Sequence, residues 1–247
     1  MDKTKQVGFS QRIRIEWIEQ TAILLLKNMK ASEIKETLRD YLNNKLSIGS
    51  NPERGAREKA ITIIMKIWVN PPKEFTKLRD DGLNFIKTLP SQEHTIINWT
   101  MIKAIYPFFG IVAENVGRLL KLQGTVSMAQ VLRRVTEQFG ERSTVIRATQ
   151  RVVRSMVDWK ILKDTNEKGV YALQQSMIVN NEQVIAWLVE AFLLENNLKS
   201  ASLDTIIKHP SLFPFEISFS RIIDFEKNRN IELIHQGYED IVVHKCL

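Results

Sequence analysis

Residues 127–173 read SMAQVLRRVTEQFGERSTVIRATQRVVRSMVDWKILKDTNEKGVYAL, and this stretch decides the expected fold. An amphipathic run over 128–139 ends at Gly140, and a polar turn leads into a second amphipathic run over 143–159. The stretch closes with two short apolar segments around a polar loop that contains Gly169. Helical spacing in the two runs predicts two helices, and the closing segments predict a β-hairpin.

The second predicted helix has two chemically different sides. At 100° per residue, one narrow sector is apolar and holds Val145, Ala148, Val152, Met156 and Trp159. The opposite side is polar and holds Arg147, Gln150, Arg151, Arg154 and Asp158. Ser143 stands where an N-cap residue is expected. Helix, turn, helix and hairpin in this order, with a basic outer face on the second helix, are typical of a winged helix-turn-helix.

This pattern predicts a nucleic-acid-binding surface, because arginine pairs with guanine edges or with phosphate oxygens. Lys168 lies beside Gly169 at the tip of the hairpin, where a wing contacts the nucleic-acid backbone. The candidate binding residues are Arg142, Arg147, Gln150, Arg151, Arg154, Lys160, Lys163 and Lys168. The alternative is an ordinary surface helix with a solvated basic face.

The amino-acid composition narrows the classes of protein to which this chain can belong. The chain has 247 residues, of which 44% are hydrophobic and 26% charged, and its net charge of +7 weakly favours a polyanionic partner. The single cysteine, Cys246, excludes an internal disulfide and suits a reducing compartment. The start MDKTKQVGFSQR lacks the apolar core of a secretory signal, and runs such as AILLL are too short to span a bilayer. We therefore expect a cytoplasmic protein that does not bind a membrane.

The chain before this stretch predicts a helical bundle over residues 10–122. Its expected helices start at Ser10, Ser32, Asn51-Pro52 and Pro90-Ser91, with two short helical pieces over 75–78 and 83–89 and a last helix to Leu122. The two pieces are expected to break near Asp80-Asp81-Gly82, and Pro71-Pro72 ends the helix before them. Trp17, Trp68 and Trp99 lie at apolar positions, which favours core packing over stacking on bases.

The chain after this stretch predicts a smaller mixed α/β region. Helices are expected over 181–194, 202–208 and 221–228, and strands in FPFEISFS and in IELIHQGYEDIVVHK, which turns at Gln236-Gly237. The pattern leaves open whether these strands continue the sheet of the earlier hairpin. The expected fold is mainly α: an N-terminal helical bundle (10–122), a winged helix-turn-helix (123–175) and a C-terminal mixed α/β region (176–247).

No catalytic or metal-binding motif is visible. The four histidines lack metal-ligand spacing, and the glycines are scattered singly rather than gathered in a phosphate loop. Nucleophile elbows and kinase signatures are also absent. These observations predict a protein that is not an enzyme and has no cofactor, no metal and no small-molecule substrate. They do not address a metal-dependent nuclease assembled from dispersed carboxylates.

Four segments, AIYPFFGIVAENVGRLL, ERSTVIRATQRVVRSMVDWKILKD, FPFEISFS and IELIHQGYEDIVVHK, occur in an order that resembles the BrxA family. These small proteins are encoded in bacteriophage-exclusion (BREX) loci, and their helical portion is likened to the RNA-binding antitermination factor NusB. The resemblance implies a non-enzymatic DNA-binding component of an antiphage system, with other BREX components as possible partners. One departure is Lys160, where the family pattern has a small residue, often glycine.

Three hypotheses follow for function. The first is binding of double-stranded DNA, with the helix over 143–159 in the major groove. The second is RNA binding through the NusB-like bundle, to which Arg54, Arg57 and Lys59 would contribute. The third is an interaction adaptor, in which the winged module docks a protein of the defence complex. Competition between duplex DNA and structured RNA separates the first two, and a partner that co-purifies in high salt favours the third.

Overall fold

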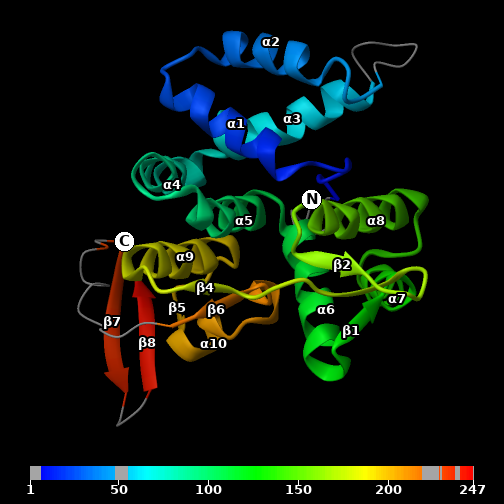
Figure 1. The fold of residues 1–247 in the computed structure, drawn as a ribbon. Helices are drawn as coiled ribbons and strands as arrows, with labels where there is room; N and C mark the ends of the chain where they lie inside the picture. Colours follow the sequence, from blue (N-terminus) through cyan, green and yellow to red (C-terminus); the bar gives the residue numbers. More distant parts are fainter. Residues whose placement is uncertain (1–6, 48–54, 219–227, 229, 237–239, 247) are drawn as a thin grey trace.

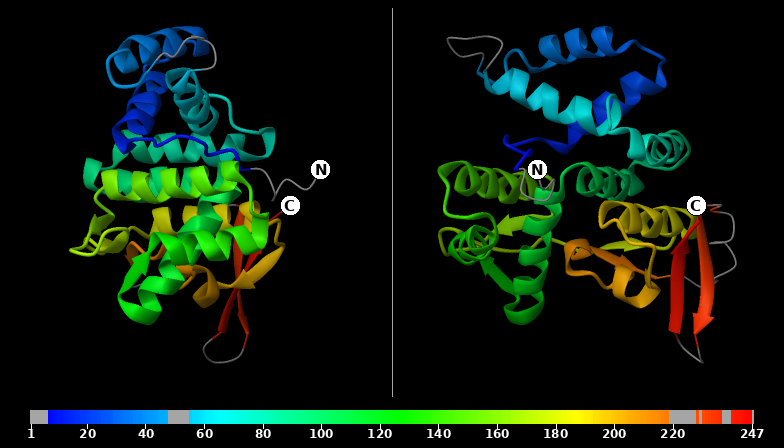
Figure 2. Two further views of the ribbon diagram at one scale, coloured as in Figure 1. Left: turned by 90° about the vertical axis from the view of Figure 1, so that its right-hand side faces the viewer. Right: turned by 180° about the vertical axis from the view of Figure 1, so that it is seen from behind.

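The computed structural model describes residues 7–47, 55–218, 228, 230–236 and 240–246. The described chain is mainly helical, with three small sheets (Figure 1). Figures 1 and 2 show α1 to α3, coloured blue to cyan, on one side of the molecule and the C-terminal sheets on the other. This agrees with the coarse expectation of a mainly α fold.

The N-terminal helices are α1 (Ile15–Leu26), α2 (Ala31–Leu42), α3 (Ala56–Trp68), α4 (Thr76–Thr88), α5 (His94–Ile105) and α6 (Pro107–Gln123). Short 3₁₀ turns, Lys73–Phe75 and Ser91–Glu93, precede α4 and α5. The expectation that Ser10 opens the first helix was wrong: residues 7–14 are not helical, and the N-cap residue of α1 is Arg14. The expected start at Asn51-Pro52 lies outside the described residues.

The expected break near Asp80-Asp81-Gly82 was also wrong, because α4 is continuous through Gly82. A Cβ atom on Gly82 would lie 2.9 Å from the Cζ2 atom of Trp187 and 3.2 Å from the Cη2 atom of Trp68. Glycine at this position lets α4 approach two tryptophan rings closely. Close packing against the two rings offsets the low helix propensity of glycine at this position.

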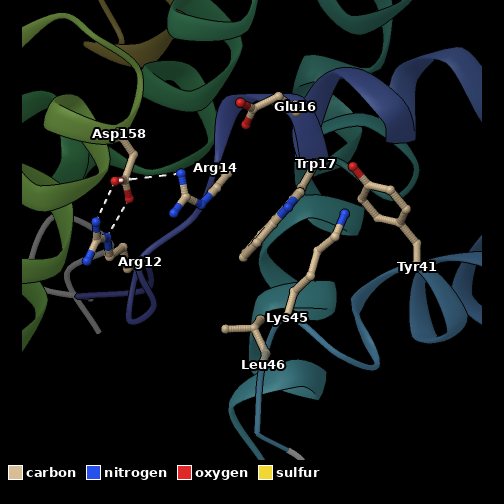
Figure 3. Close-up of a pocket in the computed structure, with 8 residues that line it drawn as sticks. All are labelled: Arg12, Arg14, Glu16, Trp17, Tyr41, Lys45, Leu46 and Asp158. Carbon is tan, nitrogen blue, oxygen red and sulfur yellow. Dashed lines mark hydrogen bonds and ion pairs between the residues drawn. The ribbon is translucent and has the colours of Figure 1, made fainter.

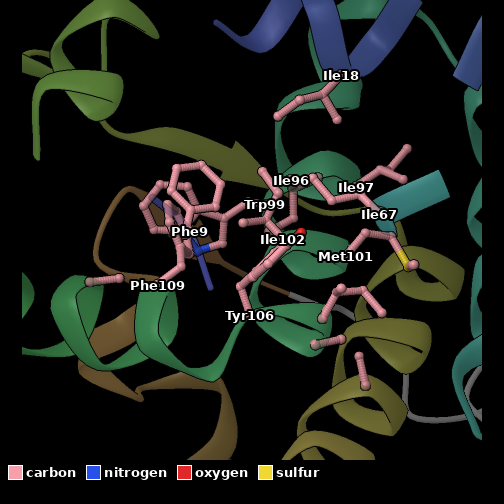
Figure 4. Packing of buried hydrophobic residues seen from close by; sticks show 14 of the residues in the cluster. Phe9, Ile18, Ile67, Ile96, Ile97, Trp99, Met101, Ile102, Tyr106 and Phe109 are labelled. Atoms are coloured by element: carbon pink, nitrogen blue, oxygen red, sulfur yellow. The ribbon is translucent and has the colours of Figure 1, made fainter. Parts of the chain in front are cut away.

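Helix α5 lies at the centre of the fold. Every residue of α5 except Thr95 is buried, so this helix has no solvent face. The Trp99 ring packs edge-on against Phe109 of α6, Trp159 and Phe215, with centroids 4.9, 6.1 and 5.7 Å away. Figure 4 shows this part of the core, in which Phe9 also packs against Phe109 at 5.5 Å. The apolar residues of all three expected regions thus share one core, and the expected domain boundaries stay a prediction.

The stretch 127–173, together with the two residues before it, packs against α6. Residues 125–173 form β1 (Thr125–Ser127), α7 (Met128–Phe139), α8 (Ser143–Asp158), β2 (Leu162–Asp164) and β3 (Val170–Leu173). The three strands form an antiparallel sheet in the order β1–β3–β2, with Val126 opposite Tyr171 and Lys163 opposite Ala172. The two helices and the hairpin were predicted, whereas β1 was not.

The helix caps differ from one another. The Ser127 hydroxyl accepts the backbone N–H of Gln130 at 3.2 Å, and the Gln130 side chain accepts the N–H of Ser127, which forms a capping box at the start of α7. The expectation that Ser143 caps the next helix was wrong. Ser143 is the first helical residue of α8, and the N-cap residue Arg142 offers no side-chain acceptor.

The C-terminal region contains β4 (Met177–Val179), α9 (Glu182–Glu195), β5 (Ser200–Ser202), α10 (Leu203–Ile207), β6 (Phe215–Ile217), β7 (Ile231–Gln236) and β8 (Asp240–Lys245). Strands β4 and β6 pair in parallel, and β5, β8 and β7 form an antiparallel sheet in that order. Within the described residues neither sheet joins the β1–β3–β2 sheet, so the option of one continuous sheet is not realised. The helix expected over 221–228 falls almost wholly outside the described residues.

Among the described residues, no single helix combines the length and the apolar composition that a membrane span needs. The segments Ser91–Ile105 and Pro107–Gln123 meet these requirements only as a pair, and they are bent by 119° at their junction.

Candidate nucleic-acid interface

The apolar sector of α8 is buried, as the sequence predicts. Val145, Val152 and Met156 are fully buried, Ala148 is 1% exposed, and the Trp159 residue that ends the helix is 7% exposed. This apolar sector holds α8 against the core. The polar side, by contrast, divides into two halves with different surroundings.

The N-terminal half of the polar side is open. Arg147 and Gln150 are exposed and have no hydrogen bond or ion pair with the described part of the chain. Ser143 and Thr144 are exposed beside them. The Arg142 guanidinium donates to the backbone carbonyl oxygen of Phe139 at 3.2 Å, which orients the side chain. Its charge has no carboxylate partner in the part of the chain that the structure describes. These residues offer donors and positive charge to a ligand.

The C-terminal half of the polar side is covered by residues 7–14, which we call the strap. The Ser155 hydroxyl accepts the backbone N–H of Ile13 at 2.9 Å, and the Arg151 guanidinium donates to the backbone carbonyl oxygen of Ser10. Phe9 and Ile13 of the strap are fully buried, which anchors it. Arg151 was predicted as a free binding residue; the structure instead uses it to hold the strap.

The Asp158 carboxylate accepts two N–H groups of Arg12 in the strap, and the guanidinium of Arg14 lies 3.8 Å from it. The hydrogen bonds to Asp158 raise the pKa of Arg12 above its ordinary value, against the opposing effect of burial. Arg154 donates to the Asp164 carboxylate of β2 at 2.8 Å. Arg154 is therefore also engaged, and it links α8 to the hairpin rather than standing free.

The hairpin carries the remaining predicted residues. Lys168 is exposed without an ion pair in the described chain, next to Gly169, whose φ of +80° shapes the tip. Lys163 is exposed too, but side chains alternate along a strand, so it lies on the opposite face of β2 from Asp164 and α8. Lys160 is exposed and has a φ of +57°, a left-handed conformation unusual for a residue with a side chain.

Sequence reasoning missed the strap and its two arginines. A signal for it exists, because Phe9, Gln11 and Ile13 are buried whereas Arg12 and Arg14 are exposed. This alternation with a period of two indicates an extended segment. Residues 10–14 were instead predicted as the start of the first helix. The helical spacing of the residues that follow masks so short an alternation.

Away from α8, one cluster has the composition of a catalytic triad but not its geometry. His209 Nδ1 accepts the backbone N–H of Ser211 at 3.3 Å and lies 2.8 Å from its hydroxyl, while Nε2 is 3.9 Å from a Glu114 carboxylate oxygen. Ser211 is only 2% exposed, and the contact caps the 3₁₀ turn Pro210–Leu212. Within the described residues no three potential ligands gather to hold a metal ion.

Neither a protein-family model, nor a curated protein, nor a solved structure matches the chain.

Proposed function

We propose that the chain binds duplex DNA and that α6 to β3 form a winged helix-turn-helix with α8 as recognition helix. The observation that carries the proposal is the open N-terminal half of α8, where Arg147 and Gln150 are exposed and unpaired within the described chain. Recognition helices contact base edges mainly with their N-terminal residues. The element order α6, β1, α7, α8, β2, β3 and the sheet order β1–β3–β2 support the same assignment.

The chemistry of the open half suits base and phosphate contacts. Arginine pairs bidentately with guanine and glutamine with adenine, so Arg147 and Gln150 are the proposed base-reading residues. Arg142, Lys160 and Lys168 are exposed cations of the same module and are the proposed phosphate contacts, with Arg142 just before α8 and Lys160 just after it. Arg154 acts indirectly, because its ion pair with Asp164 fixes the hairpin relative to α8.

The biological setting rests on the sequence resemblance to the BrxA family. On that basis the chain is a non-enzymatic component of a bacteriophage-exclusion system that acts in the cytoplasm. Recognition of DNA within that system is the role we assign to it.

The test is duplex binding measured across salt concentration. The three proposed phosphate contacts give a slope of log affinity against log salt of about −2 to −3. Arg147→Ala should weaken binding, either by lowering the salt slope by about one or by relaxing sequence preference at one position. Lys87→Ala, which removes an exposed cation of α4 remote from the interface, is the matched control. A salt-independent affinity, or wild-type binding by Arg147→Ala, would reject the proposal.

The same experiment separates the other two hypotheses. Structured RNA that competes better than duplex DNA at equal salt would favour the RNA-binding alternative. A protein that stays bound in high salt when nucleic acid does not would favour the adaptor.

A further inference from the structure

A cavity of about 590 Å³ lies beside the proposed interface, between the strap, the start of α1 and the C-terminal end of α2 (Figure 3). Its volume is in the range of small-molecule sites and exceeds what an inorganic anion needs. The residues that matter for its chemistry are Arg14, Glu16, Trp17, Tyr41, Lys45 and Leu46. Arg12 of the strap and Asp158 at the end of α8 also line the cavity and link it to the proposed interface.

Two cations that line this cavity have no hydrogen-bonded acceptor in the described chain. Arg14 has a side chain that is 49% exposed, and its nearest carboxylate, Asp158, is 3.8 Å away and already accepts two N–H groups of Arg12. The Lys45 ammonium lies 3.3 Å from the centre of the Tyr41 ring and has no carboxylate partner among the described residues. Guanidinium and ammonium groups form strong, charge-assisted hydrogen bonds with phosphate oxygens.

The cavity also has an apolar wall. Trp17 is 5% exposed and extends its indole between Arg14 and Lys45, with Leu46 below it (Figure 3). Nucleobases have flat apolar faces that contact aromatic and aliphatic side chains, and their amino groups donate to carboxylates such as Glu16. Cations and an apolar wall in one cavity match the two halves of a nucleotide.

We propose that this cavity binds a nucleotide, with the phosphate between Arg14 and Lys45 and the base against Trp17 and Leu46. The proposal does not rest on duplex binding by α8. The nucleotide has two possible sources, a free mononucleotide and the phosphorylated end of a strand, which share the same chemistry.

Titration calorimetry with the four 5′-mononucleotides, the matching nucleosides and inorganic phosphate tests the proposal. A mononucleotide should bind at least tenfold more tightly than its nucleoside or phosphate alone. Arg14→Gln and Lys45→Gln should each weaken it by about tenfold or more, the strength of one charge-assisted hydrogen bond. Lys27→Gln, which removes an exposed lysine just after α1, should leave binding unchanged.

A 5′-phosphorylated single-stranded oligonucleotide, measured in parallel, identifies the source by its affinity relative to the mononucleotide. The proposal is overturned if no nucleotide binds, if inorganic phosphate binds as well as the nucleotide, or if both glutamine variants bind like wild type. Arg147→Ala should retain nucleotide binding. A wild-type protein that binds a mononucleotide but not duplex DNA would reject only the role of α8. A wild-type protein that binds duplex DNA but no mononucleotide would reject only the cavity.

Discussion

The indole N–H of Trp159 donates to the backbone carbonyl oxygen of Ile13 at 2.9 Å. This hydrogen bond joins the end of α8 to the strap, while the Trp159 ring packs against Phe109 with centroids 5.7 Å apart. One side chain therefore connects the proposed interface, the strap and the central core. Changes at the C-terminal half of α8 should affect folding, whereas changes at its open N-terminal half should not.

Trp159→Ala should destabilise the protein by about 3–5 kcal/mol, because it removes a large buried ring and the hydrogen bond to Ile13. Urea denaturation at neutral pH measures the loss. Trp159→Phe keeps most of the ring packing and loses the hydrogen bond, so it should cost much less. An alanine variant as stable as wild type would contradict the packing described for this residue.

The arginines of α8 should separate by their effect on stability. The free energy of unfolding of Arg147→Ala should stay within about ±0.5 kcal/mol of wild type, because Arg147 is exposed and has no partner in the described chain. Arg151→Ala should cost about 1 kcal/mol, because it releases the carbonyl oxygen of Ser10, and Arg154→Ala up to about 1 kcal/mol through its exposed pair with Asp164. Thermal denaturation of the three variants gives the ranking. If Arg151→Ala matches Arg147→Ala, the strap does not depend on Arg151.

The sequence predicts helix α8 and its buried face, but it does not predict that the strap covers part of its polar face. A period of 3.6 over sixteen residues fixes the buried sector from Val145 to Met156. The strap reaches α8 from about 140 residues earlier in the chain, as in the bond from Ile13 to Ser155, and no local pattern encodes such a contact. Strand β1 is three residues long and is recognisable only through its pairing with β3. The sequence Asp80-Asp81-Gly82 predicts a helix break, and it does not reveal that Gly82 packs against the distant residues Trp68 and Trp187.

The backbone of Lys160 has a left-handed conformation that favours glycine over a residue with a side chain. The N–H of Lys160 donates to the carbonyl oxygen of Val157 at 3.0 Å and that of Ile161 to the carbonyl oxygen of Met156 at 3.0 Å, the Schellman arrangement after α8. Lys160→Gly relieves the left-handed strain at φ +57° and should leave stability unchanged or raise it by up to about 1 kcal/mol.

Lys160→Ala removes the same charge and keeps the strain, so it is the matched comparison for both readouts. Equal duplex binding by the two variants, both weaker than wild type, would assign the loss to the ammonium group. A glycine variant less stable than the alanine variant in urea denaturation would contradict the left-handed conformation of this residue.

A last prediction concerns acid stability and lies far from α8. Glu58 of α3 is 8% exposed, and its carboxylate accepts the Nε and Nη2 groups of Arg39 at 2.9 and 3.0 Å. These hydrogen bonds lower the pKa of Glu58 below its ordinary value of 4.5, although burial acts in the opposite direction. A lowered pKa in the folded state means that the carboxylate stabilises the fold above the unfolded-state pKa. This contribution is lost as the pH falls through the folded-state pKa.

Glu58→Gln should therefore lower the free energy of unfolding by about 1–3 kcal/mol at neutral pH. The difference in free energy of unfolding between this variant and wild type should become smaller as the pH falls below about 4.5. Urea denaturation of both proteins over this pH range measures the difference. Glu36→Gln is the matched control, because Glu36 also pairs with Arg39, at 2.6 Å, but its side chain is 66% exposed. The free energy of unfolding of Glu36→Gln should stay within about 0.5 kcal/mol of wild type at every pH, since exposed ion pairs contribute little to stability. If the difference in free energy of unfolding between Glu58→Gln and wild type stays constant at acidic pH, the lost stability comes from packing of the side chain and not from its charge.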